Sequence, residues 1–262
     1  MLIDTHCHLN FPDYEKDLPE VLKRSREAGV EKIICASSNL ADSIKAIEIA
    51  QKYPGFVFAS IGIHPQKTDP NNKDLPIEQI RKLGELVKEK GVVAIGECGL
   101  DYSLAPDGEE DRTHEEQLFL FEEQIEIAKL NNLALIVHSR KSFKDTLEVL
   151  VKHQNGSLRG VLHCYSGGKK GIAPALAIGF YLGIDGNVTY DEGLQSVVKE
   201  IPLEKILLET DSPYLSPKPF RGKRNEPANI ALIANCIVGL KNTDLVAVSN
   251  IISETSKELF YI

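Results

Sequence analysis

Short runs of apolar and β-branched residues alternate with longer helix-periodic segments along the whole chain, and this alternation constrains the fold more than any other feature. We predict eight strands, at residues 1–6, 31–37, 56–63, 92–98, 134–139, 159–165, 180–186 and 205–211. Regular alternation predicts a parallel sheet, and eight repeats favour closure into a (β/α)8 TIM barrel. An open doubly wound sheet is the alternative. We expect one domain, residues 1–262.

The segments between the predicted strands carry helix signals. Residues 113–131 begin with a capping box, Thr113 and Glu116, and continue with apolar residues at helical spacing. Residues 228–240 and 244–260 are predicted to close the chain as two further helices. These segments are long enough to connect parallel strands.

Two segments are predicted as loops from their composition. Residues 101–112 are rich in acids, Gly and Pro, and residues 212–227 contain too many prolines for a helix. The second loop follows the eighth predicted strand, so a barrel would place it over the active face. Its length indicates more than a connector.

Side chains of the metal-ligand type lie at the ends of several predicted strands. A single histidine or acid in such a place is more often a packing residue or a loop acid, and the His-x-His pair of the first strand is weak evidence alone. The joint pattern is different, because barrel enzymes place their chemistry at the carboxyl ends of their strands. The predicted ligands are His6, His8, Glu97, His138, His163 and Asp211.

Four histidines and two carboxylates exceed what one tetrahedral zinc ion needs. They divide into two sites with a shared carboxylate, and Glu97 is the bridging candidate because its strand lies between the two groups. A pair of divalent cations can clamp an oxygen of the substrate and lower the pKa of a bound water. The sequence therefore predicts a metal-dependent hydrolase.

Seven motifs in order make the sequence resemble the TatD family of metal-dependent deoxyribonucleases, within the amidohydrolase superfamily. The resemblance covers nearly the entire chain. The motifs are Ile3-Asp-Thr-His-Cys-His8, Gly62-Ile-His-Pro65, Ala94-Ile-Gly-Glu-Cys-Gly-Leu-Asp-Tyr102, Val137-His-Ser-Arg140, His163-Cys-Tyr-Ser-Gly167, Glu209-Thr-Asp-Ser-Pro-Tyr-Leu215 and Arg221-Gly-Lys-Arg-Asn-Glu-Pro227.

The resemblance implies a barrel with two divalent cations, Zn²⁺, Mn²⁺ or Mg²⁺. It implies cleavage of DNA phosphodiesters, often from the 3′ end, and Glu97 in the place where many amidohydrolases have a carbamylated lysine. One cation is expected on His6, His8, Glu97 and Asp211, and the other on Glu97, His138 and His163.

Further residues receive roles around this centre. Asp211 is expected to orient or deprotonate the attacking water, and His64 to donate a hydrogen bond to the phosphate. Arg140 is expected to brace the same phosphate. Glu209 is a further expected substrate contact, with orientation of a ligand as its alternative role. The other expected contacts are Arg221, Lys223 and Arg224 on the nucleic-acid backbone, and Tyr165 and Tyr214 on a terminal base. For the arginines and tyrosines, surface ion pairing and wall packing are the alternatives.

Charge and cysteine content limit the partners. A formal charge of −8 argues against a broad basic surface for duplex nucleic acid, so we expect site-directed contact with single-stranded DNA ends. Five scattered cysteines without a CxxC pair predict neither a disulfide framework nor a zinc knuckle. No apolar run reaches the length of a membrane span and no export signal opens the chain. We expect a cytoplasmic protein without membrane contact, as a monomer or small homo-oligomer.

Two other functions fit the same residues. The first keeps the metal ions and changes the substrate to an ester or amide, as in a D-aminoacyl-tRNA deacylase. The second is a non-catalytic metal-dependent binding protein, which the complete ligand set disfavours.

Overall fold

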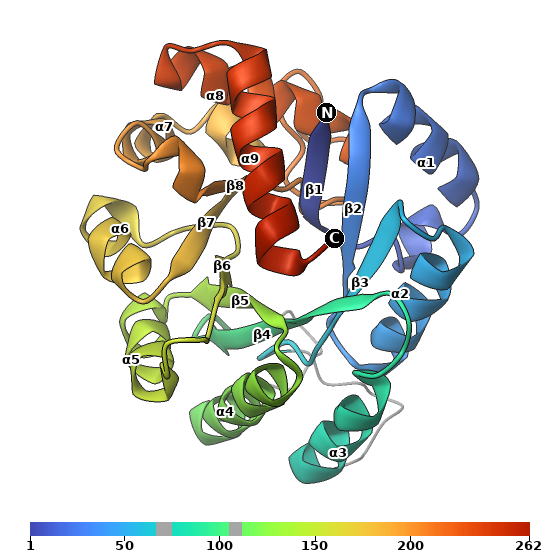
Figure 1. Cartoon of the computed structure of the whole chain (residues 1–262), viewed down its shortest axis with the longest axis vertical. Coiled ribbons are helices and arrows are strands. Elements are labelled where there is room, and N and C mark those ends of the chain that lie inside the picture. The colour runs from blue at the N-terminus through green and yellow to red at the C-terminus, as the bar shows by residue number, and fades with distance from the viewer. Residues whose placement is uncertain (67–74, 105–111) are drawn as a thin grey trace.

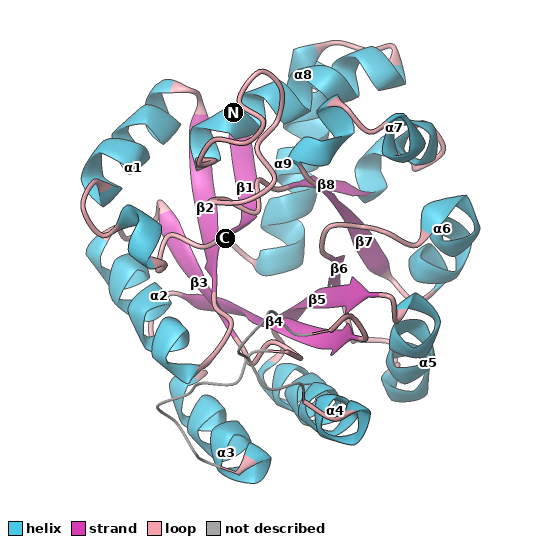
Figure 2. Ribbon diagram, turned by 180° about the vertical axis from the view of Figure 1, so that it is seen from behind, coloured by secondary structure: helices cyan, strands magenta, loops and turns pink. Residues whose placement is uncertain are grey.

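The computed structural model describes residues 1–66, 75–104 and 112–262. Eight strands form one parallel sheet in the order β1 to β8, and Figure 2 shows them arranged as a ring. The predicted (β/α)8 barrel is confirmed. The strands are β1 Leu2–Cys7, β2 Val30–Ala36, β3 Val57–Ile61, β4 Val92–Asp101, β5 Ala134–Arg140, β6 Gly160–Leu162, β7 Phe180–Ile184 and β8 Ile206–Leu208.

Helices surround the ring of strands (Figure 1). Helix α4 begins with the predicted capping box, in which Thr113 Oγ1 accepts the Glu116 N–H at 3.2 Å and Glu116 Oε2 accepts the Thr113 N–H at 3.1 Å. The helices are α1 Leu18–Glu27, α2 Leu40–Lys52, α3 Pro76–Leu86, α4 His114–Asn131, α5 Phe143–His153, α6 Gly168–Ala177, α7 Glu192–Val198, α8 Ile230–Lys241 and α9 Leu245–Phe260. Short 3₁₀ helices span Pro12–Tyr14, Gly186–Thr189, Leu203–Lys205 and Pro227–Asn229.

Among the described residues, no single helix combines the length and apolar composition of a membrane span. The bent pair Pro227–Lys241 and Leu245–Phe260 meets that criterion only when its two helices are taken together.

Side chains complete the contact between the first and last strands. Thr5 Oγ1 donates to the Leu208 carbonyl at 3.0 Å, and Asp4 Oδ2 accepts the Thr210 hydroxyl at 2.6 Å. The Thr210 N–H also donates to Asp4 Oδ1, at 3.0 Å. All four residues are buried, so these bonds form inside the protein, where an unmade hydrogen bond is costly. They bring the two edges of the sheet together.

A small apolar cluster fills the barrel beneath its carboxyl end. It contains Ile136 of β5 and Val161 of β6, together with Leu259 and Phe260 at the end of α9. Figure 1 shows α9 in front of the ring of strands. Because strand side chains alternate between two faces, the residue two positions after each interior apolar residue also points inward. His138 and His163 occupy such positions.

The observed strand ends differ from the predicted ones where the chain turns away from the barrel. Strand β6 ends at Leu162 and β8 at Leu208, three residues earlier than predicted. The turns that follow contain Cys164 at φ 44° and Asp211 at φ 52°, a left-handed conformation that no strand accommodates.

The two predicted loops have different outcomes. Residues 212–227 form a loop that supplies Tyr214 and Leu215 to the pocket, as its place after the last strand predicts. The predicted loop 101–112 is wrong at its start, because β4 continues to Asp101. Most of its remainder, residues 105–111, lies outside the described residues.

Candidate metal centre

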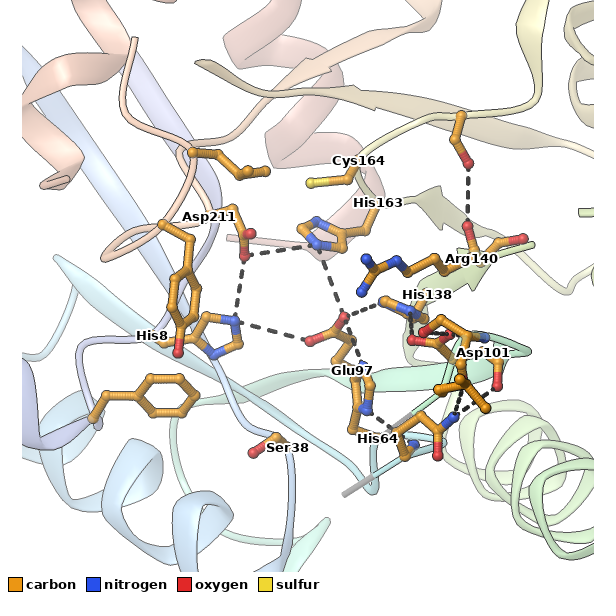
Figure 3. Close-up of a pocket in the computed structure, with 18 residues that line it drawn as sticks. His8, Ser38, His64, Glu97, Asp101, His138, Arg140, His163, Cys164 and Asp211 are labelled. Carbon is orange, nitrogen blue, oxygen red and sulfur yellow. Dashed lines mark hydrogen bonds and ion pairs between the residues drawn. The ribbon is translucent and has the colours of Figure 1, made fainter. Parts of the chain in front are cut away.

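Glu97 lies at the centre of the site, and Figure 3 shows its carboxylate between His8 on one side and His138 and His163 on the other. Its Oε1 atom is 2.7 Å from Nδ1 of His138 and 3.9 Å from Nε2 of His163. Its Oε2 atom is 3.7 Å from Nε2 of His6 and 3.9 Å from Nε2 of His8. The glutamate is only 5% exposed. This division of the carboxylate is the geometry that a bridging ligand requires.

Asp211 completes the cluster from the turn after β8. Its Oδ1 atom is 3.4 Å from Nε2 of His8, 3.5 Å from Nε2 of His6 and 3.7 Å from Nε2 of His163. The structure therefore brings together all six predicted ligands, which come from the ends of β1, β4, β5, β6 and β8.

A hydrogen bond at the outer ring nitrogen orients His8. Nδ1 of His8 lies 3.1 Å from the Ala36 carbonyl, which only accepts, so this nitrogen carries the proton and Nε2 presents a lone pair to the centre. Nε2 of His6 is 3.2 Å from Nε2 of His8. A cation held by both rings would satisfy the two nitrogens together.

Glu209 lies beneath His163 rather than in the pocket. Its Oε1 atom is 3.0 Å from Nδ1 of His163 and accepts the Cys164 N–H at 2.6 Å. Glycine at position 183 makes room for it, because an added Cβ would overlap the Glu209 carboxylate. Glu209 is completely buried, so the expected contact with substrate is disfavoured and the geometry favours the alternative role, orientation of a ligand.

The site concentrates charges that compensate one another. Burial would raise the pKa of Glu97, but the charges of His64, His138 and His163 hold it well below its usual value. Burial would lower the pKa of His138, but hydrogen bonds with Asp101 and Glu97 raise it to about 9. Buried carboxylates therefore create a demand for positive charge, which divalent cations meet.

Asp101 is a site residue that sequence reasoning missed. It lies at the end of β4, where Oδ2 is 3.0 Å from Nε2 of His138, and its other oxygen accepts the N–H of Ser103 at 2.8 Å. Nδ1 of His138 is thereby turned toward Glu97. Asp101 is four residues after Glu97 on the same strand, so period-2 alternation would have placed both on one face.

His64 lies three residues beyond the end of β3, on the wall of the same pocket. Its Nδ1 atom accepts the Gln66 N–H at 3.1 Å, so the proton of a neutral ring is on Nε2. Nε2 is 3.7 Å from Oε1 of Glu97. This arrangement fits a hydrogen-bond donor better than a metal ligand.

The predicted arginines lie in different environments. Arg140 lines the pocket, and Figure 3 shows its side chain extending toward the pocket centre. Arg221 instead stacks on Tyr190 at 4.4 Å from the ring centroid. Arg224 forms a bidentate ion pair with Asp17, at 2.9 and 2.6 Å. Arg221 and Arg224 are absent from the described pocket lining, and their contacts favour structural roles over substrate contact.

Aromatic residues line one side of the pocket. The Phe11 ring, which sequence reasoning missed, stacks on His8 with centroids 4.4 Å apart, and Tyr214 lies next to it. Tyr165 is 5% exposed and its hydroxyl donates to the Gly168 carbonyl at 2.8 Å, so it packs in the wall and is not available for a base.

The pocket has a volume of about 740 Å³ and contains most of the residues described above. Within the described part of the chain, His6, His8 and Glu97 form one group able to hold a metal ion, and His6, His163 and Asp211 form another. Histidine nitrogens with carboxylate oxygens are a donor set that suits Zn²⁺ and Mn²⁺. The residues present therefore fit a resident cation.

Comparison with known proteins identifies the family. The family model described as TatD related DNase matches residues 3–261. The chain belongs to the TatD family. This TatD chain is 36% identical to a Bacillus subtilis protein named uncharacterized metal-dependent hydrolase YabD, over the full length of both. It is 32% identical to human deoxyribonuclease TATDN3, over 99% of this chain and 94% of that protein.

A solved structure agrees with this TatD assignment. The crystal structure of YjjV, a TatD homologue from Escherichia coli, superimposes with a TM-score of 0.88 at 28% identity, covering 100% of this chain and 98% of that one. The protein is thus a metal-dependent hydrolase of the TatD type.

Proposed function

We propose that the protein is a deoxyribonuclease that hydrolyses phosphodiester bonds at single-stranded 3′ ends. The observation that carries the proposal is the divided carboxylate of Glu97, with one oxygen toward His6 and His8 and the other toward His138 and His163. Paired cations joined by such a carboxylate are typical of phosphodiester hydrolysis. The name deoxyribonuclease of the human relative supports the choice of DNA.

The proposal assigns two cation sites. His6, His8, Glu97 and Asp211 would hold one cation. Glu97, His138 and His163 would hold the other, since Oε1 of Glu97 lies 2.7 Å from His138 and 3.9 Å from His163. Divalent cations there supply a water of lowered pKa and positive charge for the phosphoryl oxygens.

Asp211 is the proposed general base. Its side chain is 14% exposed and lines the pocket, so it can reach a water molecule that approaches the phosphorus. The water oxygen bonds to phosphorus, and one water proton passes to the Asp211 carboxylate. The bond from phosphorus to the 3′ oxygen breaks, and that oxygen takes up the proton that the Asp211 carboxyl received. The products are a nucleoside 5′-phosphate and a shortened strand with a 3′ hydroxyl.

His64 and Arg140 hold the phosphate in this scheme. The Nε2 proton of His64 faces the pocket because its Nδ1 atom accepts the Gln66 N–H. It is proposed to donate to a non-bridging oxygen. Arg140 also lines the pocket and offers paired donors to the same phosphate.

The test uses metal-stripped protein to which Mg²⁺, Mn²⁺ or Zn²⁺ is restored singly, with end-labelled single-stranded DNA, RNA and aminoacyl-tRNA as substrates. DNA cleavage is expected with the parent. Asp211→Ala is expected to lose about 10²–10⁴-fold in rate, the usual contribution of a positioned base. Glu97→Ala is expected to abolish cleavage because both cation sites lose a ligand.

The matched control is Glu258→Ala, the same kind of substitution at an exposed position of α9, far from the pocket lining. It should cleave like the parent, and circular dichroism should show the same fold for all variants. Parental cleavage rates in both Glu97→Ala and Asp211→Ala would refute the mechanism. Release of amino acid from tRNA without DNA cleavage would replace the proposed substrate.

A further inference from the structure

Tyr214 presents a large aromatic side chain to the metal pocket with 55% of its surface exposed. It belongs to the loop after β8, three residues after Asp211. Phe11 adjoins it across the pocket wall, with ring centroids 6.3 Å apart and an angle of 73° between the rings. The two rings thus form an aromatic corner beside the centre.

The backbone holds Tyr214 firmly in this exposed position. Its N–H donates to the Asp211 carbonyl at 2.9 Å, and its carbonyl accepts from Nδ2 of Asn225 at 2.7 Å. Asn225 is completely buried. With its backbone held, the tyrosine has only two side-chain torsions to order when a ligand stacks on it, so little conformational entropy is lost.

Phe11 connects the aromatic corner to the metal centre through its contact with His8. Its ring is stacked on His8 with an interplanar angle of 15° and a centroid distance of 4.4 Å. His8 is in turn 3.4 Å from Asp211 through its Nε2 atom. A planar ligand on the face of Tyr214 therefore lies on the side of the pocket where His8 and Asp211 meet.

We infer that Tyr214 and Phe11 form a stacking subsite for the unpaired nucleobase next to the scissile phosphate, an inference that rests on the proposed nuclease function. Every base has a π-face, so stacking of this kind tolerates all four bases. A base inside a duplex has both faces covered by its neighbours. The subsite therefore selects frayed or single-stranded ends, and stacking does not require a positive net charge, which this chain of charge −8 does not have.

The experiment is a double-mutant cycle in which one change is made in the protein and the other in the substrate. Parent, Tyr214→Ala and Tyr214→Phe are assayed with Mn²⁺ on two single-stranded oligonucleotides that differ only in the terminal residue, a normal nucleotide or an abasic tetrahydrofuran. For the parent, loss of the base is expected to raise KM by about 5- to 100-fold, the range for stacking of one base. Tyr214→Ala should raise KM by a similar factor on the normal strand and no further on the abasic strand.

Two variants complete the comparison. Tyr214→Phe keeps the ring and is expected to remain within about twofold of the parental KM. Tyr261→Ala removes another exposed tyrosine, which contacts Arg159 and does not line the described pocket, and should leave KM unchanged.

The outcomes separate the subsite from the function. If Tyr214→Ala keeps the parental KM, or if its effect and that of base removal multiply independently, the subsite is overturned while the nuclease function stands. If the parent cleaves neither oligonucleotide, the proposed function fails, and the inference fails with it.

Discussion

His8 and His64 face the same pocket with opposite hydrogen-bonding capacity. Nδ1 of His8 lies against the Ala36 carbonyl, so its Nε2 atom is free to bind a cation. Nδ1 of His64 accepts the Gln66 N–H, so its Nε2 atom carries a proton. The two rings are chemically identical as residues. Their different roles are set by backbone groups that the fold places beside them.

Asp101 acts on the centre through His138. Asp101→Asn keeps the shape of the side chain and removes the negative charge that faces Nε2 of His138 at 3.0 Å. Loss of such an orienting carboxylate typically lowers metal affinity by about 10- to 100-fold. We expect a decrease in that range when Zn²⁺ or Mn²⁺ is titrated into stripped protein and followed by calorimetry.

The control for this variant is Asp145→Asn, which removes an exposed carboxylate that accepts the Tyr102 hydroxyl at 2.9 Å on the neighbouring helix α5. It should bind metal like the parent. Both variants should also melt close to the parental temperature without metal. If Asp101→Asn binds metal with the parental affinity, Asp101 does not support the metal centre.

At the scale of elements, the loop after β8 depends on one buried side chain. Nδ2 of Asn225 donates to the carbonyls of Thr210 and Tyr214 at 2.9 and 2.7 Å, and Oδ1 accepts from Nδ2 of Asn229 at 2.8 Å. Asn225→Ala leaves buried carbonyls without donors. We expect it to lower the free energy of unfolding by about 2–4 kcal/mol and to reduce cleavage, because Tyr214 loses its anchor.

Arg224→Ala is the comparison within the same loop. Its ion pair with Asp17 is about one third exposed on both sides, at 32% and 33%, so solvent screens it. The expected loss is only about 0.2–1 kcal/mol. Urea unfolding measures the free energy of unfolding of Asn225→Ala and Arg224→Ala. An equal or larger decrease in Arg224→Ala would contradict the assignment of the anchor to Asn225.

The sequence predicted the elements well because each strand needs apolar residues where it is buried. It predicted their ends poorly. His163 comes directly before Cys164, which has φ 44°, and Asp211 itself has φ 52°. Cysteine gives no signal for a left-handed conformation, and aspartate adopts it too rarely to predict it at one position. The six predicted ligands nevertheless converge, since their position beside core residues survives an error of three residues in a strand end.

The residues around the ligands were less predictable, for a physical reason. Arg224 and Arg140 look alike in the sequence, and only the fold shows that the first is bound to Asp17 while the second lines the pocket. Asp101 was hidden because its acidic surroundings resemble a loop, although it ends the longest strand. Partners distant in sequence decide these roles, and residue type does not report them.

At the scale of the whole molecule, a protein of charge −8 gathers buried carboxylates at one end of its barrel. Glu97 and Glu209 are 5% and 0% exposed. Cations that bind only the folded state stabilise it in proportion to the logarithm of their concentration. The metal centre should therefore contribute to stability as well as to chemistry.

This gives a prediction for metal removal. At a cation concentration about 100 times the dissociation constant, stabilisation is about 2.7 kcal/mol, which corresponds to a rise of about 5–10 °C in melting temperature for a chain of this size. Differential scanning fluorimetry in chelator and then in Mn²⁺ or Zn²⁺ measures the shift. Glu97→Ala should show little of it. An equal shift in that variant would place the stabilising cations elsewhere.

The bonds that join β1 to β8 also determine when the centre can exist. They connect residues 203 and 206 positions apart, Thr5 with Leu208 and Asp4 with Thr210. During synthesis β1, which carries His6, is made first. Its neighbour β8 is made only after most of the chain has been translated. Until then the histidines of β1 have no partner strand on one side. We therefore expect hydrolytic competence only in chains that have reached β8.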